Sequence, residues 1–187
     1  MRHLSRKLAY VFVYTLSALA SSPDTHSSCV SGADAQQVAT NYGSLMANYT
    51  NSLANAALSA TFTMYSESEA ALIDSCGQNP AVVVVPLLSP TFSNRTQFEE
   101  GQGAQPSVIF QQLNIWHSCA AVIIRWYIPN VVDIANVQPV IGILTMETRP
   151  APTDNVYPYL IETVYSEYDA STNIASLQAA GFCSGVE

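Results

Sequence analysis

Apolar residues in the first third of the chain recur at the spacing of amphipathic helices. From Asp34 to Met46 they fall at intervals of three and four residues, which places them on one helical face: Ala35, Val38, Ala39, Tyr42, Leu45 and Met46. Ser31 or Asp34 is placed to cap this helix. A second, alanine-rich helix is expected over Thr50–Leu58, and the β-forming alternation at Thr61–Tyr65 predicts a short strand after it.

The middle of the chain has weaker patterns. Residues 66–81 are polar and are expected to form a loop. Val82–Val85 is an unbroken β-branched run, but the prolines that follow it limit the length of any strand there. Ser93 or Asn94 can cap a short helix over Thr96–Glu100.

Apolar and β-branched residues dominate the second half of the chain. Turn residues and prolines divide them into four expected strands, Val108–His117, Ala121–Ile128, Val140–Thr148 and Tyr159–Tyr168, and a closing helix is expected over Asn173–Ala180. Helices gathered at the start and strands at the end predict an α+β domain. In such a domain the N-terminal helices would close a strongly curved antiparallel sheet, a cone around an apolar pocket.

The first twenty residues have the order of a secretory signal peptide. Four basic residues lie among the first seven: Arg2, His3, Arg6 and Lys7. An apolar run at Leu8–Leu16 follows, and Ala18-Leu19-Ala20 supplies the small residues of a cleavage site. The run is shorter than the ~20 residues of a membrane span. We therefore predict a signal peptide at residues 1–20 and one secreted domain at residues 21–187.

Loss of that segment would leave a strongly acidic chain. Three arginines, Arg95, Arg125 and Arg149, would stand against fourteen carboxylates, a formal charge of −11. Such a surface repels phosphate backbones and anionic lipid, which argues against nucleic acid or a membrane as partner. With 49% apolar and 11% charged residues, the chain has the composition of a folded globule.

The four cysteines, Cys29, Cys76, Cys119 and Cys183, predict two disulfides in a secreted chain. Tracing the expected strands back and forth places Cys29, Cys76 and Cys119 near one end of the cone. That placement favours Cys29 with Cys76 but leaves all three connectivities open. Neither C-x-x-C spacing nor a histidine cluster is present, so no metal site is expected.

The hairpin formed by the first two long strands offers a candidate catalytic residue. A two-residue turn at Cys119-Ala120 would pair three sets of residues on one apolar, concave face: His117 with Val122, Ile115 with Ile124, and Leu113 with Trp126. A histidine at the rim of an apolar cone could exchange a proton near neutral pH. The alternative is a histidine that is simply hydrogen-bonded at a hairpin end.

Two carboxylates and several large side chains are further candidates. Glu147 and Glu167 end apolar strands, and a carboxyl in apolar surroundings has a raised pKa and can act as an acid. Both could equally be solvated strand ends. The candidates for ligand contact are Tyr65, Trp116, Arg125, Trp126 and Tyr165. The aromatic residues could instead be ordinary core or surface residues, and Arg125 could be a simple ion-pair partner.

Several strings of the sequence resemble fungal secreted NTF2-like proteins. The longest are FQQLNIWHSC at Phe110–Cys119, PVIGI at Pro139–Ile143, YPYLI at Tyr157–Ile161 and TVYSEY at Thr163–Tyr168. Shorter matches occur at Asn55–Leu58, Tyr65–Ser68, Phe98–Gly103 and Ile124–Trp126. The resemblance extends over about residues 29–169, whereas the tail, residues 170–187, does not share it.

The resemblance implies an NTF2-like fold and a small apolar ligand, with no cofactor. The few members similar to characterised enzymes are hetero-Diels–Alderases (pericyclases) of fungal tropolone–sesquiterpenoid biosynthesis. These help a hydroxymethyl tropolone to lose water and the resulting quinone methide to add to a humulene alkene. Two alternatives stay open: a non-catalytic extracellular binding protein, and a dehydratase or isomerase that uses His117 with a carboxylate. A homodimer is compatible with each of these functions.

Export through the secretory pathway should alter the protein in two ways. We expect its N-terminus near Ser21, and sugar at one of the two sequons, Asn48-Tyr49-Thr50 or Asn94-Arg95-Thr96. N-terminal sequencing and a gel shift after glycosidase treatment check both parts. A secreted protein that still begins at Met1 would contradict the expectation.

Overall fold

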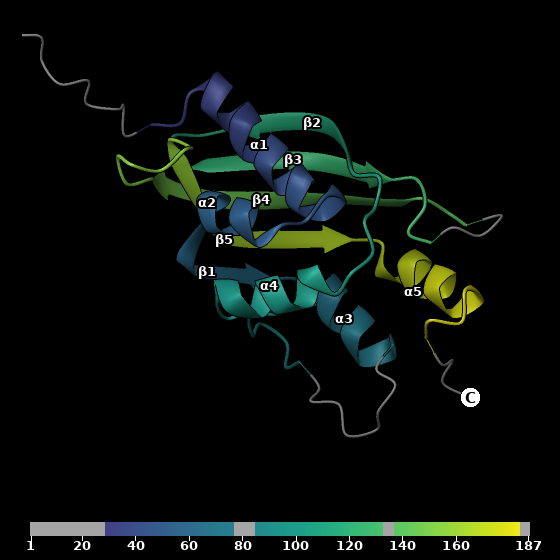
Figure 1. The fold of residues 1–187 in the computed structure, drawn as a ribbon. Helices are drawn as coiled ribbons and strands as arrows, with labels where there is room; N and C mark the ends of the chain where they lie inside the picture. The colour runs from purple at the N-terminus through teal and green to yellow at the C-terminus, as the bar shows by residue number, and fades with distance from the viewer. Residues whose placement is uncertain (1–28, 77–84, 133–136, 184–187) are drawn as a thin grey trace, which may run out of the picture.

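The computed structural model describes residues 29–76, 85–132 and 137–183 (Figure 1). Its elements, in chain order, are α1 (Gly32–Ala47), α2 (Asn51–Ala57), β1 (Leu58–Tyr65), α3 (Glu67–Cys76), α4 (Arg95–Gly103), β2 (Gln111–His117), β3 (Ala121–Ile128), β4 (Val140–Pro150), β5 (Tyr159–Tyr168) and α5 (Ala170–Ala179). The expected signal peptide and most of the expected Val82–Val85 strand lie outside the described residues. None of the described helices is long and apolar enough to cross a membrane.

The five strands form one curved sheet in the order β1-β5-β4-β3-β2. The pairs β2–β3, β3–β4 and β4–β5 are antiparallel, whereas β1 pairs parallel with β5. The α+β prediction is confirmed, whereas the expected antiparallel sheet is in fact mixed. Parallel pairing requires a long crossover between the two strands. Here residues 66–158, about half of the chain, lie between β1 and β5, so local patterns could not reveal their relative direction.

Helices α1, α2 and α4 cover one face of the sheet, and the core lies between these two layers (Figure 1). Ser31 and Asp34, both expected as caps, start α1 together in a reciprocal capping box. The largest fully buried side chains include Leu45, Leu58, Phe62, Phe98, Ile124, Leu144, Met146 and Ile161. The opposite face of the sheet carries exposed residues, among them Trp116 and Ile143, each 50% exposed.

The concave face has one position where only glycine fits. A Cβ at Gly142 would lie 2.4 Å from Trp126 Cζ2 and 2.8 Å from the Glu167 carbonyl oxygen. The Trp126 ring therefore lies directly over the backbone of β4. The end of a flexible side chain could move aside from such a close contact, but a rigid indole ring cannot. The contact therefore fixes the plane of the ring.

The β2–β3 hairpin follows the expected register only near its turn. His117 pairs with Val122 and Ile115 with Ile124, as the two-residue turn predicted. Beyond them the register shifts between Gln112 and Asn114, so that Gln112 rather than Leu113 pairs with Trp126. Leu113 occupies this bulge and is 44% exposed, which corrects its expected place on the apolar face.

Helix α3 replaces most of the loop expected over residues 66–81. Its first amides, those of Glu67 and Ser68, donate to the Glu167 carboxylate at 3.0 and 3.1 Å, and the Ser68 hydroxyl donates to it as well. A carboxylate at a helix N-terminus satisfies free N–H groups and stabilises the helix dipole. Part of the start signal for α3 thus lies about a hundred residues away, on β5.

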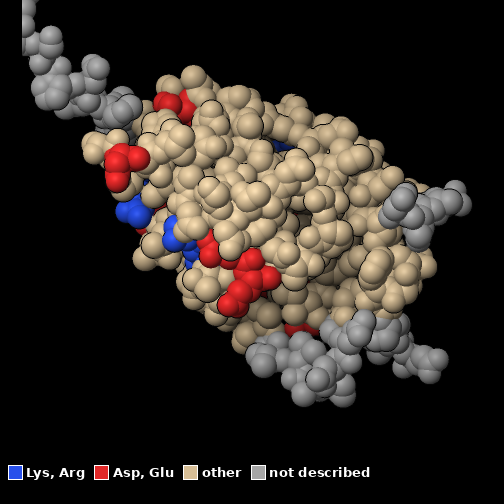
Figure 2. Space-filling model, in the orientation of Figure 1, with Lys and Arg blue, Asp and Glu red and all other residues tan. Residues whose placement is uncertain are grey.

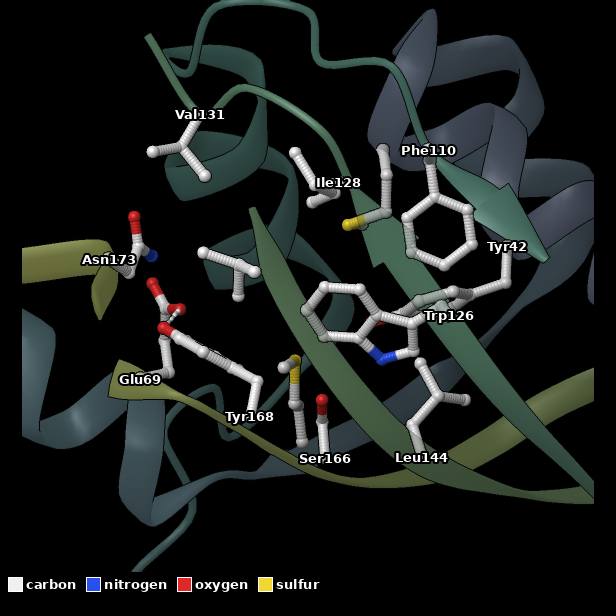
Figure 3. A pocket seen from close by; sticks show the side chains of 13 residues that line it. Tyr42, Glu69, Phe110, Trp126, Ile128, Val131, Leu144, Ser166, Tyr168 and Asn173 are labelled. Atoms are coloured by element: carbon white, nitrogen blue, oxygen red, sulfur yellow. Dashed lines mark hydrogen bonds between the residues drawn. The ribbon is translucent and has the colours of Figure 1, made fainter. Parts of the chain in front are cut away.

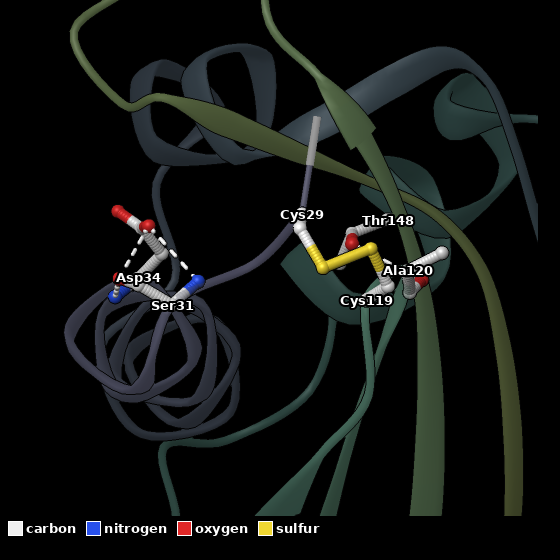
Figure 4. The surroundings of a disulfide bond; sticks show 6 residues. All are labelled: Cys29, Ser31, Asp34, Cys119, Ala120 and Thr148. Carbon is white, nitrogen blue, oxygen red and sulfur yellow. Dashed lines mark hydrogen bonds between the residues drawn. A yellow bond between two sulfur atoms is a disulfide. The ribbon is translucent and has the colours of Figure 1, made fainter. Parts of the chain in front are cut away.

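Two disulfides join Cys29 with Cys119 and Cys76 with Cys183. The number of bridges is as predicted, but the favoured pairing of Cys29 with Cys76 is wrong. Figure 4 shows the first bridge between the segment before α1 and the hairpin turn, close to the capping box. Because α3 carries Cys76 away from that turn and toward α5, its partner is Cys183, which follows α5.

Charged side chains are sparse on the face that Figure 2 shows, where they gather near α4 and along one edge. Within α4, Arg95 and Glu99 form an ion pair of 3.4 Å. Elsewhere on this face charged atoms show only as small, recessed patches (Figure 2). Both sequon asparagines lie at helix ends: Asn48 is exposed at the end of α1, whereas Asn94 caps α4 through its side-chain oxygen.

Disulfide mapping provides the first structural test. Digestion without reductant should release peptides that link Cys29 with Cys119 and Cys76 with Cys183. Replacing both Cys76 and Cys183 by serine should lower the free energy of unfolding by ~2–5 kcal/mol, as is typical for a native bridge. A peptide that links Cys29 with Cys76 would contradict this topology.

Candidate functional site

A largely apolar, partly open cavity of about 120 Å³, here called the inner pocket, lies on the concave face of the sheet (Figure 3). It is lined by Tyr42, Met46, Met64, Glu69, Phe110, Trp126, Ile128, Val131, Val140, Leu144, Ser166, Tyr168 and Asn173. A second cavity of about 420 Å³, the outer hollow, lies next to the Cys76–Cys183 bridge. The two share Met46, Glu69, Ile128, Val131 and Asn173, so the outer hollow adjoins the inner pocket.

Aromatic rings form one wall of the inner pocket. Phe110 stacks on Trp126 with ring centroids 5.5 Å apart, and Tyr42 meets Phe110 edge-on at 6.2 Å. Tyr168 is tilted against Trp126 at 5.8 Å. Mutual contacts of this kind hold large rings in one arrangement, so the wall has a defined shape.

The polar end of the inner pocket is built by three elements. Glu69 comes from α3, Tyr168 from the end of β5 and Asn173 from α5. The Tyr168 hydroxyl donates to Glu69 Oε2 at 2.7 Å, and the Asn173 side chain is hydrogen-bonded to Tyr168. In Figure 3 the three groups meet at the opposite end of the pocket from Phe110 and Tyr42.

Burial shifts the proton equilibria of this end. It raises the pKa of the Glu69 carboxyl above the ordinary 4.5, and the hydrogen bond from Tyr168 only partly opposes that effect. Burial, followed by the Glu69 charge, also raises the pKa of the Tyr42 and Tyr168 hydroxyls. Both phenols therefore stay protonated at neutral pH, and Glu69 is the group able to exchange a proton there.

Of the eight catalytic and ligand-binding residues predicted from the sequence, only Trp126 lines the inner pocket. His117 and Glu147 are exposed, and Glu167 caps α3. Trp116, Arg125 and Tyr165 are also exposed, with Tyr65 stacked on Tyr165 at 5.4 Å. Their roles remain predictions, but the structure does not bring these side chains together around the inner pocket.

The sequence reading missed Glu69, Tyr168 and Asn173 as site residues. The polar composition of residues 66–81 predicts a loop at Glu69, although Ser66 to Glu69 has the S-x-x-E pattern of a helix start. The Ser66 hydroxyl does accept a hydrogen bond from the Glu69 amide, at 3.0 Å. That signal could have identified α3, but nothing in the sequence indicates that the Glu69 side chain would lie beside Tyr168.

Among the described residues, no group of three or more His, Cys, Asp or Glu side chains is arranged to hold a metal ion.

A family model described as an NTF2-like domain matches residues 28–182. IdmH from Streptomyces antibioticus, a candidate polyketide cyclase, has a similar structure, with a TM-score of 0.51 and 11% identity over 77% of this chain and 98% of its own. A protein with a ketosteroid isomerase-like fold from Catenulispora acidiphila, in complex with trimethylamine, has a TM-score of 0.51 and 12% identity over 75% of this chain and 91% of its own. Likeness at such identity concerns the fold alone. A search of curated sequences found no match.

The raised pKa of Glu69 predicts a pH-dependent stability. Above pH 4.5 the folded chain retains a proton that the unfolded chain releases, so stability should fall as pH rises through the window between 4.5 and the raised value. Glu69→Gln removes this dependence, and the variant should therefore gain stability relative to wild type as pH rises. Denaturant titrations from pH 4 to 8 measure it, with the exposed Glu100→Gln as control. Parallel wild-type and Glu69→Gln profiles would contradict the buried carboxyl.

Proposed function

The chain belongs to the NTF2-like domain family, and from this premise we propose that it is an enzyme of the cyclase or isomerase type. It binds a small, largely apolar molecule in the inner pocket and moves a proton on that molecule. One observation carries the proposal: a carboxyl of raised pKa, Glu69, lies hydrogen-bonded to Tyr168 at the polar end of an otherwise apolar pocket.

Glu69 is the general acid or base in this proposal. A carboxyl whose pKa is moved toward neutrality can both donate and accept a proton at working pH, and such a group typically contributes ~10²–10⁴ in rate. Tyr168 and Asn173 are positioning residues. The Tyr168 hydroxyl holds the carboxyl from one side, and Asn173 in turn fixes Tyr168.

A more specific form of the proposal is a pericyclase that first assists a dehydration. Protonated Glu69 gives its proton to the hydroxyl of a hydroxymethyl tropolone, the C–O bond breaks and water leaves. The ring hydroxyl then returns a proton to Glu69, which yields the neutral quinone methide. Its cycloaddition to an alkene forms a C–C and a C–O bond without further proton transfer, and needs only that the two partners are held in one orientation.

The size of the cavities supports a substrate pair better than a single small molecule. The inner pocket, at about 120 Å³, is smaller than the ~300–1,000 Å³ of ordinary small-molecule sites, whereas the outer hollow, at about 420 Å³, lies within that range. The outer hollow also has apolar walls, including Leu72, Ile73 and Leu177. A tropolone in the inner pocket could thus meet a terpene in the outer hollow.

Turnover of a hydroxymethyl tropolone in the presence of humulene tests the proposal. Wild type should speed product formation and favour one stereoisomer. Glu69→Gln should slow dehydration by ~10²–10⁴ but largely spare cycloaddition of a preformed quinone methide, and Tyr168→Phe should have a smaller effect. The measurement is product yield and isomer ratio by chiral chromatography, with Glu100→Gln as the matched carboxylate control.

Two results would decide against this assignment. A loss of rate in His117→Ala but not in Glu69→Gln would favour the histidine predicted from the sequence. Equal rates and isomer ratios with and without wild-type protein would reject the pericyclase for these substrates. If the tropolone nevertheless bound, the binding-protein alternative would stand.

A further inference from the structure

Three buried side-chain atoms in the described part of the chain have no hydrogen-bond partner: Glu99 Oε1, Trp126 Nε1 and Asn173 Oδ1. The first lies 3.4 Å from Arg95 Nε and is explained by that ion pair. The other two belong to residues that line the inner pocket. Buried polar atoms of folded proteins almost always have partners, so two exceptions around one cavity point to a ligand.

Trp126 presents a fixed hydrogen-bond donor. The residue is 5% exposed, and its ring lies between Phe110 and the backbone at Gly142. Its Nε1–H can only donate, and the ring cannot turn to seek another acceptor. Figure 3 shows Nε1 on the edge of the ring that faces Leu144 and Ser166, at the floor of the pocket.

Asn173 presents an acceptor at the other end. Its side chain is hydrogen-bonded to Tyr168, while its Oδ1 has no partner. The residue lines both the inner pocket and the outer hollow. In Figure 3 the amide nitrogen of Asn173 faces the Tyr168–Glu69 pair, to which the proposed function assigns the proton transfer, and Oδ1 points away from that pair.

We propose that Trp126 Nε1 and Asn173 Oδ1 bind the two polar ends of the ligand, which is a compact hydroxy ketone with an apolar body. The ketone oxygen accepts from Trp126 Nε1–H at the floor, and the hydroxyl donates to Asn173 Oδ1 at the polar end of the pocket. This inference rests on the proposed function, because it deepens the same site by naming its substrate class. It also sets the direction of binding, with the hydroxyl toward the proton-transferring group.

Four probes with one carbon skeleton separate the two contacts. They are 6-hydroxy-1-tetralone, 1-tetralone, 5,6,7,8-tetrahydro-2-naphthol and tetralin, which carry both polar groups, the ketone, the hydroxyl or neither. A neutral hydrogen bond contributes ~0.5–1.5 kcal/mol, so each group should tighten binding to the full chain about 2- to 12-fold. Calorimetric titration of the oxidised protein gives the four dissociation constants.

Two variants should each remove one preference. Asn173→Leu should abolish the gain from the hydroxyl and keep the gain from the ketone. Replacing Trp126 by benzothienylalanine, which has sulfur in place of the N–H, should do the reverse with little change in shape. Because both tryptophans would be replaced during such incorporation, Trp116→Phe supplies the background for this comparison.

A spectroscopic readout guards against a folding defect in either variant. In Trp116→Phe the indole N–H of Trp126 is the one remaining indole signal in a ¹H–¹⁵N spectrum, since the chain has two tryptophans. It should move downfield with 1-tetralone and not with tetralin. A signal that stays in place while 1-tetralone binds, equal affinities for all four probes, or no binding of any probe would overturn the inference.

The two proposals fail in different ways. Missing probe selectivity, together with a Glu69→Gln variant that still loses turnover, would reject the ligand assignment alone and would indicate that water satisfies both atoms. Intact probe selectivity with no effect of Glu69→Gln would reject the catalytic role and keep the ligand class.

Discussion

The carboxylate of Glu167 on the first amides of α3 is the contact on which the rest of the site depends. The two residues that follow it in the chain complete the arrangement. Tyr168 donates to Glu69 on α3, and Asp169 caps α5 by accepting from the Thr172 amide at 3.0 Å. Hydrogen bonds from Thr172 and Ser171 lower the pKa of Asp169 to about 2, so this cap stays ionised. Three consecutive residues at the end of β5 thus hold two helices and one end of the inner pocket.

This arrangement explains why the tail belongs to the site. Helix α5 supplies Asn173 to the pocket, and Cys183 behind it is bridged to Cys76 at the end of α3. Both helices are therefore held at two points, one at the strand end and one at the disulfide. The polar groups they carry are kept at the junction of two cavities, where small displacements would change hydrogen bonding most.

The opposite end of the pocket is organised by packing instead of hydrogen bonds. Because Gly142 has no side chain, Trp126 can lie flat on the sheet. Phe110 stacks on Trp126, and Tyr42 packs edge-on against Phe110. A pocket with a rigid aromatic wall and one titratable end suits chemistry in which shape sets the product and a single proton sets the rate. The NTF2-like fold alone does not choose among such reactions, because function resides in the side chains of the site.

The sequence by itself determined the α+β class, the positions of most helices and strands, and the presence of two disulfides. These follow from local periodicity and capping, as at Ser31 and at the strand over Tyr159–Tyr168, where neighbouring residues contain the whole signal. It also singled out Trp126, which apolar alternation places on the concave face. Tertiary structure alone decided the parallel pairing of β1, the bulge at Leu113, the cysteine partners and the meeting of Glu69 with Tyr168 and Asn173. The strand pairing, the disulfides and the Glu69 contacts join segments that are far apart in the chain, and the bulge shifts the register within one strand. Side-chain periodicity contains no information about either kind of feature.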